Sequence, residues 1–158
     1  MSEVEDMLTA TIEKNKALAE KNPDLYEPDL VTNYNNLGVL YKDANKYEEA
    51  EQMLLSAIEI IKRLVKKNPD VYEPVLATSY NNLAGIYYET KRVTEAEDLF
   101  ASELEINKKL AEKNPDLYEP NLAISYNNLA GVYCKTNRMS DAENLLTVAL
   151  EINKKLVK

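Results

Sequence analysis

Apolar residues recur along most of the chain at intervals of three and four, which is the spacing of one face of an α-helix. In one such stretch they fall at Tyr26, Leu30, Tyr34, Leu37 and Tyr41. No stretch alternates apolar and polar residues with a period of two, which is the pattern of a half-buried strand. We therefore predict an all-α fold without a sheet.

The same pattern occurs three times. Tyr-Asn-Asn-Leu, followed by Gly or Ala, begins at Tyr34, Tyr80 and Tyr126, and Asn-Pro-Asp begins at Asn22, Asn68 and Asn114. Both markers recur every 46 residues. A fixed period of this size indicates a repeat array, in which each helical hairpin must stack on its neighbours to bury its apolar face.

The proline of each Asn-Pro-Asp marker disfavours helix in the residue before it, so the markers divide the chain. We predict seven antiparallel helices in one right-handed solenoid domain spanning 1–158. The ranges are 1–22 for an orphan helix, and 23–67, 68–113 and 114–158 for three helical hairpins. Shifted by one period, the orphan helix aligns with the second helix of a hairpin.

Local signals suggest where the helices begin and end. Capping-box spacing is found for Ser2 with Glu5, Thr94 with Glu97, and Ser140 with Glu143. The first helix of the first hairpin is expected to begin between Asp24 and Pro28, a range in which the sequence does not choose one start. Asn45 and Asn137 suit the left-handed conformation that ends a helix, whereas Lys91 at the equivalent place suits it less.

Composition narrows the possible functions. The chain of 158 residues has a net charge of −8 and a pI near 4.7, which argues against nucleic acid and against anionic membrane surfaces as partners. It contains no histidine, and Cys134 is its single cysteine, so we expect no internal disulfide and no metal site. With no apolar run long enough to span a membrane and no secretory signal, a cytoplasmic protein is expected.

An enzyme is not expected. The sequence has no histidine, no glycine-rich phosphate loop and no nucleophile–base pair, and its many carboxylates are spread over helix surfaces. We therefore predict a protein without catalytic residues and without a cofactor.

The repeat resembles the tetratricopeptide repeat. The first unit carries the family's aromatic, leucine and small residues at Tyr34, Leu37, Gly38, Tyr41, Ala50, Leu54 and Ala57. The later units match at the equivalent positions, except that Glu103 stands where the family has a small residue. The 46-residue period exceeds the usual ~34 of the family, and such elongated units are similar to those of the kinesin light chain and its bacterial relatives. The resemblance implies a solenoid that binds other proteins.

The groove of such a solenoid is lined by the first helix of each hairpin. The candidate binding residues on these helices include the paired asparagines Asn35, Asn36, Asn81, Asn82, Asn127 and Asn128. An amide both donates and accepts, so a row of amides can hold the backbone of an extended peptide. One asparagine of each pair should face the groove or reach the next repeat. The alternative is that Asn36 and its counterparts clamp the neighbouring helix.

Other positions on the same face vary between the repeats. They are Val39, Gly85 and Gly131, then Thr32, Thr78 and Ile124 near one end, and Lys42, Tyr88 and Cys134 near the other. Glycine inside a helix is unfavourable, so Gly85 and Gly131 indicate a need for space, either for a ligand or for a packed neighbouring helix. Tyr88 is a candidate binding anchor. The basic residues with which some relatives clamp a terminal carboxylate are absent at most matching positions.

The leading hypothesis is a protein-interaction module that binds an extended peptide or a partner helix in this groove. The alternative is a scaffold that assembles through exposed solenoid ends, including a possible homo-oligomer, or a fragment of a larger sensor protein. Tyr34, Tyr41 and their equivalents in the later repeats are expected in the core with their hydroxyls at its edge.

Overall fold

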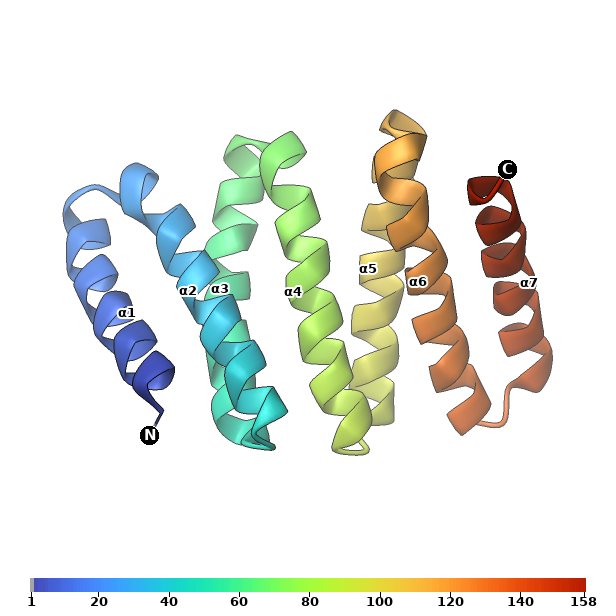
Figure 1. Ribbon diagram of the computed structural model, residues 1–158, viewed down its shortest axis with the longest axis horizontal. Helices are drawn as coiled ribbons and strands as arrows, with labels where there is room; N and C mark the ends of the chain where they lie inside the picture. The colour runs from blue at the N-terminus through green and yellow to red at the C-terminus, as the bar shows by residue number, and fades with distance from the viewer. Residues whose placement is uncertain (1) are drawn as a thin grey trace. The chain divides into compact units, whose positions relative to one another are not determined.

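The computed structural model describes residues 2–158, and over this range the backbone forms seven α-helices joined by short turns (Figure 1). The helices are α1 (Glu3–Lys21), α2 (Pro23–Asp43), α3 (Tyr47–Lys67), α4 (Pro69–Glu89), α5 (Val93–Lys113), α6 (Pro115–Lys135) and α7 (Met139–Leu156). No residue of the described range lies in a strand. The prediction of an all-α fold is confirmed.

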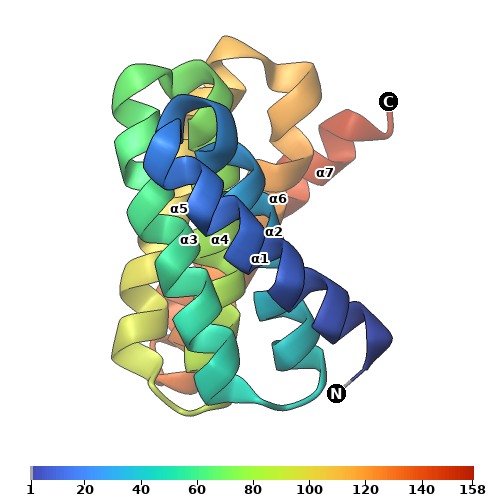
Figure 2. The same ribbon diagram turned by 90° about the vertical axis from the view of Figure 1, so that its left-hand side faces the viewer.

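The chain forms two compact units, one up to Ile86 and one from Tyr87 to Lys158, with the boundary inside α4. We call α2, α4 and α6 first-type helices and α1, α3, α5 and α7 second-type helices, after their places in the repeat. In the first unit α2 packs on both α1 and α3, and Figure 2 shows α1 in front of this group. In the second unit α6 packs on both α5 and α7. Each unit therefore places a first-type helix between two second-type helices.

A single asparagine joins each second-type helix to the next first-type helix. Asn22 has a φ of −146° and a ψ of 84°, and its two counterparts have nearly the same angles. The predicted start between Asp24 and Pro28 is too late, because Pro23 itself occupies the first helical position of α2. Proline fits there since its φ is helical and its missing N–H breaks no bond. Pro28 lies inside α2, where it removes one backbone hydrogen bond.

Each first-type helix ends in a turn that contains one residue with positive φ. The φ angles are 59° at Asn45, 64° at Lys91 and 60° at Asn137. The next residue donates its N–H to a tyrosine carbonyl at 2.8 Å in all three turns, which closes the end of the helix. The expectation for the two asparagines is confirmed. Lys91 adopts the same conformation although its side chain disfavours it.

The capping boxes are only partly as predicted. Ser2 Oγ accepts the backbone N–H of Glu5 at 3.1 Å, so the first box is present. The predicted boxes at Thr94 and Ser140 are wrong. The helix α5 begins at Val93 and α7 begins at Met139, so Thr94 and Ser140 already lie inside the helices, and neither helix has a side-chain cap bond. The residues before them, Arg92 and Arg138, have their backbone N–H groups fixed by the turns, which places the helix start ahead of the threonine and the serine.

The core of the first unit depends on close helix approach. Ala50, Leu54, Ala57 and Ile61 are 0% exposed. A β-carbon added at Gly38 would lie 2.8 Å from Leu54 Cγ. Glycine at this position therefore allows α2 and α3 to pack more closely than alanine would.

A buried polar cluster occupies the corresponding region of the second unit. Glu103 is 4% exposed, and its Oε1 accepts hydrogen bonds from Asn107 Nδ2 at 3.0 Å and from Ser125 Oγ at 2.8 Å. Asn107 Nδ2 also donates to Ser125 Oγ at 2.7 Å. The departure from the family's small residue is thus accommodated by hydrogen bonds between α5 and α6. In the other hairpins Ala57 and Ala149 occupy the position of Glu103 and are buried.

Candidate binding groove on the first-type helices

The six candidate asparagines differ in their surroundings. Asn36 and Asn127 are exposed, whereas Asn35, Asn81, Asn82 and Asn128 are half-buried. Asn35 has a structural contact, because its Oδ1 accepts the hydroxyl of the fully buried Ser79 at 3.0 Å. Ser79 lies on α4, so in the first unit Asn35 is the member of the pair that reaches the next first-type helix.

In the second unit, four of the predicted groove residues surround one hollow of about 190 Å³. Tyr88, Asn127, Asn128 and Gly131 line it together with Phe100. Apart from its chain neighbours and the nearby backbone of its own helix, a β-carbon added at Gly131 would meet no atom of the described residues within 4 Å. Gly131 therefore keeps space open at the surface, and no neighbouring helix of the described chain packs against it.

Tyr88 forms one wall of this hollow, and Lys135 covers its ring. Lys135 Nζ lies 3.8 Å from the ring centroid and donates to the Tyr88 carbonyl at 3.4 Å. Lys135 is exposed, and a cation–π contact at an exposed site contributes about 0.5–1 kcal/mol, so a ligand can displace the ammonium group. The ammonium group places a positive charge beside the hollow in a chain whose net charge is −8.

In the first unit the structure brings together two other predicted residues. Lys42 Nζ lies 3.8 Å from the place of a β-carbon at Gly85. Both residues are half-buried, as is Val39. Because the nearest atom to Gly85 is the end of a flexible side chain, this part of the face also has room for a side chain or a ligand.

The remaining candidates are more dispersed. Thr32 and Thr78 are exposed and donate their hydroxyls to the carbonyls of the interior prolines one turn earlier, at 3.1 Å in each case. Ile124 is 53% exposed. Cys134 is exposed but lines a different hollow, together with residues of α7. The structure therefore does not place it in the hollow around Asn128.

Sequence reasoning missed a larger hollow of about 550 Å³ in the first unit. It is lined by residues of α1, α2 and α3, namely Thr9, Ile12, Glu13, Lys16, Tyr34, Leu37, Tyr41, Gln52, Met53, Leu55 and Ser56. Their helical spacing predicts a core position for Tyr34 and Tyr41, and Tyr34 is only 7% exposed. The helical pattern carries no signal for this hollow, because the hollow is formed by three helices together, α1, α2 and α3, and the pattern describes one helix at a time.

Two further observations concern the described residues as a set. Among residues 2–158, no group of three or more His, Cys, Asp and Glu side chains is arranged to hold a metal ion. No helix in the same range is both long enough and apolar enough to cross a membrane.

The antiparallel hairpins, their 46-residue step and their interlocking small residues define a helical-repeat protein. The chain belongs to the tetratricopeptide repeat family: one form of the repeat matches residues 75–155 and a second form matches residues 32–70. Members of this family generally bind proteins or peptides, and the fold is typically a non-enzymatic scaffold. A comparison with curated protein sequences found no match.

Solved structures share the fold. BtubC from P. vanneervenii has a TM-score of 0.71 and 23% identity over 99% of this chain, which spans 59% of the BtubC chain. A putative kinesin light chain with nearly identical TPR-like repeats from Podosopora anserina has a TM-score of 0.64 and 20% identity, with 94% of this chain and 68% of that chain covered. The N-terminal domain of stress-induced protein-1 from C. elegans has a TM-score of 0.59 and 21% identity, with 82% and 94% covered. The predicted resemblance is confirmed at the level of family and fold.

Proposed function

We propose that this chain is a protein-interaction module that holds an extended peptide, or a partner helix, against its first-type helices. The observation that carries the proposal is the hollow of about 190 Å³ in the second unit. Its lining combines two adjacent amides, Asn127 and Asn128, with the aromatic rings of Tyr88 and Phe100. These are groups that hold a peptide without a cofactor.

The proposed mechanism assigns a separate role to each kind of lining residue. The amides of Asn127 and Asn128 donate to and accept from the ligand backbone, which allows binding without one required sequence. Tyr88 supplies a large contact surface with little loss of side-chain freedom. Gly131 lets the ligand backbone approach the helix, because it has no side chain.

The test is a peptide-library selection on the purified chain and on the double variant Asn127→Ala and Asn128→Ala. Loss of two ligand hydrogen bonds should weaken enriched peptides about tenfold or more. Asn35 is left intact because its amide holds Ser79. Asn144→Ala, an exposed position on α7, is the matched control and should leave affinity unchanged.

Gly131→Ala gives a second variant that does not remove any polar group. Alanine should raise helix stability by up to ~1 kcal/mol, while its methyl group enters the hollow and lowers affinity. Thermal melts followed by circular dichroism verify that both variants stay folded. Peptides that bind the double variant and Gly131→Ala as tightly as the original chain would rule out this groove as the site.

A further inference from the structure

On α6, Tyr126 and Tyr133 each carry a basic side chain of the same unit over the ring. Lys108 Nζ on α5 lies 6.0 Å from the Tyr126 ring centroid, and Arg138 Cζ lies 3.8 Å from that of Tyr133. Such contacts place a positive charge against the negative face of the ring. Both rings are therefore cation-binding surfaces that the chain itself covers.

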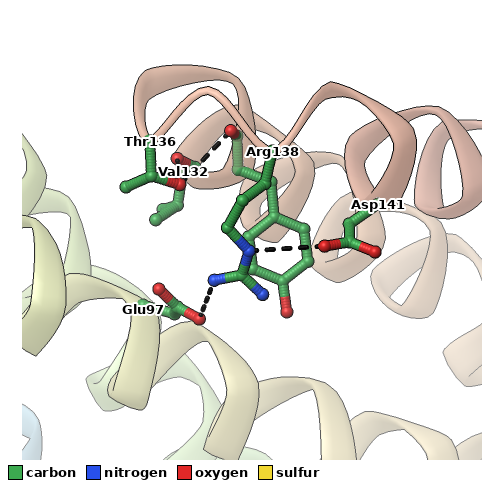
Figure 3. Close-up of polar contacts among 6 residues, drawn as sticks. Glu97, Val132, Thr136, Arg138 and Asp141 are labelled. Carbon is green, nitrogen blue, oxygen red and sulfur yellow. Dashed lines mark hydrogen bonds and ion pairs between the residues drawn. The ribbon is translucent and has the colours of Figure 1, made fainter.

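A carboxylate holds each of these cations in place. Lys108 Nζ pairs with Glu105 Oε1 at 2.9 Å. Figure 3 shows the Arg138 guanidinium between Glu97 and Asp141, which it meets at 2.7 Å and 3.4 Å. Each cation site thus has two parts, an aromatic ring beneath the cation and a carboxylate beside it.

The first unit repeats this arrangement at Tyr41 but not at Tyr34. Lys46 Nζ lies 5.3 Å from the Tyr41 ring centroid and 3.5 Å from Glu5 Oε1. Tyr34 stands two repeat periods before Tyr126, yet no basic side chain of the described residues lies over its ring. The ring of Tyr34 is therefore free of the cation that its counterpart in the second unit carries.

Tyr34 lines the hollow of about 550 Å³ in the first unit, together with Glu13 and Lys16 of α1. We call this hollow the Tyr34 pocket. Tyr34 is 7% exposed, and its hydroxyl has no hydrogen-bond partner among the described residues, although a buried tyrosine hydroxyl usually has one. Glu13 and Lys16 are the counterparts of Glu105 and Lys108, but both are exposed and neither forms an ion pair within the described range. A ring and a carboxylate of the kind that hold Lys108 are thus both present and unengaged.

The size and the other walls of the Tyr34 pocket suit a small molecule with an apolar body. Ligand pockets commonly measure about 300–1,000 Å³ and combine apolar walls with a few polar groups. Ile12, Leu37 and Met53 provide apolar wall here. The polar part of a ligand would then lie at Tyr34 and Glu13, and its apolar part along these three side chains.

The charge around the Tyr34 pocket favours a cation over an anion. The chain has a net charge of −8. Burial raises the pKa of the Tyr41 hydroxyl, and the hydrogen bond with Glu5 and the negative charges of Glu5 and Glu49 raise it further. Those charges make the potential beside Tyr41 negative, and Lys16 opposes it from the rim. An aliphatic amine is protonated at pH 7, because its pKa is close to the value of about 10.4 for lysine.

We propose that the Tyr34 pocket binds a small aliphatic amine, whose ammonium group pairs with Glu13 against the ring and hydroxyl of Tyr34 as Lys108 pairs with Glu105 against Tyr126. The ammonium group donates one hydrogen bond to the Glu13 carboxylate and one to the hydroxyl oxygen of Tyr34. On α2 the pocket lies away from the candidate groove, because Val39 is rotated by about 140° from Tyr34 around the helix. The proposal therefore does not depend on peptide binding.

The probes are hexylamine, hexanol and heptanoate, which share one hexyl body and differ in charge. Each is titrated into the full chain with labelled methyl groups, and binding is followed by NMR up to millimolar concentrations. We expect saturable shifts of the Ile12 and Met53 methyl signals, with hexylamine binding about fivefold or more tightly than hexanol and heptanoate most weakly. Equal affinity for the amine and the alcohol, tighter binding of heptanoate, or no saturable shift of these signals would overturn the proposal.

Two charge variants test the position of the ammonium group. Glu13→Gln should weaken hexylamine about threefold or more, whereas Lys16→Gln should strengthen it about twofold or more, because a competing positive charge leaves the rim. Glu112→Gln removes the same charge as Glu13→Gln at an exposed position of the second unit and should leave affinity unchanged. Equal weakening by the two glutamate variants, or weakening by Lys16→Gln, would contradict the pairing with Glu13.

Tyr34→Phe keeps the ring and removes only the hydroxyl. Because this hydroxyl has no partner among the described residues, the thermal melt should not change. Hexylamine should bind about threefold or more weakly, since one hydrogen bond from a charged donor is lost, and hexanol should be affected less. An affinity for hexylamine equal to that of the original chain would show that the ammonium group does not lie at Tyr34, and our proposal would be wrong.

Discussion

Gly38 and Gly131 lie on first-type helices but meet opposite surroundings. At Gly38 an added β-carbon would lie 2.8 Å from Leu54 Cγ and 3.4 Å from the Ala50 carbonyl oxygen. At Gly131 the same atom would meet open space in the described chain. A sequence pattern shows the same residue type at both positions, so only the neighbouring helix distinguishes a packing glycine from a surface glycine.

We expect Gly38→Ala to destabilise the chain by about 1–3 kcal/mol through overpacking, less the ~1 kcal/mol that alanine gains in a helix. Gly131→Ala should instead raise the free energy of unfolding, because the helix gain is not opposed by a clash. Urea unfolding followed by circular dichroism measures both. An equal gain for the two variants would show that Leu54 moves aside without loss.

Between helices, the cluster of Glu103, Asn107 and Ser125 shows how the second unit solves a packing problem differently from the first. The first unit has Ala57 and Ile61 where the second has Glu103 and Asn107, and both of these apolar residues are 0% exposed. A buried polar network is stable only while each member keeps its partners. The two arrangements should therefore not be exchangeable one residue at a time.

Glu103→Ala alone should cost about 1–3 kcal/mol, because it leaves the buried amide of Asn107 with one partner fewer. Adding Asn107→Ile copies the apolar arrangement of the first unit and should recover most of that loss. Ser125 keeps its bond to the Asn121 carbonyl at 3.0 Å in both variants. Equilibrium unfolding of the single and double variants provides the comparison, and additive losses would contradict this account.

For the molecule taken together, acid sensitivity should depend partly on Glu5, which is 6% exposed and joins α1 to the turn after α2. Burial would raise the pKa of Glu5, but the hydrogen bond with Tyr41 and the charge of Lys46 outweigh it and hold the pKa below its ordinary value. The carboxylate therefore contributes stability in full above the unfolded pKa of about 4.3, and this contribution is lost as pH falls through the lower folded pKa.

Glu5→Gln should accordingly be less stable than the original chain at pH 7, and the difference should shrink as pH falls below about 4. Glu3→Gln, an exposed position in the same helical turn, is the control and should show a smaller difference. Unfolding free energies measured from pH 7 to pH 3 test the sign. A difference between Glu5→Gln and the original chain that does not vary with pH would contradict the assignment.

Much of this architecture can be predicted from the sequence because its causes are local. The asparagine–proline junctions, the turn residues at Asn45 and Asn137 and the apolar stripes all act within a few residues, so helix number and order followed from them. The predicted capping boxes at Thr94 and Ser140 are absent, and the cause is also local. Both pairs have the spacing of a capping box, but the turn before each helix makes an earlier residue the first of the helix.

The asparagine pairs mark where prediction from the sequence stops. Helical geometry places Asn35 and Asn36 about 100° apart but does not say which one meets the next helix. The contact of Asn35 with Ser79 requires α4 to be in place. The hollow around Asn128 likewise needs α4, α5 and α6 together.

The amino-acid pattern alone was enough to establish a helical repeat, its 46-residue period and the apolar stripe of each helix. The packing of helices then assigned different roles to equivalent residues. It buried Glu103, gave Asn35 a structural partner and left space beside Tyr34. The physical reason is that periodicity is a property of one helix, whereas burial depends on which neighbouring helix covers that face.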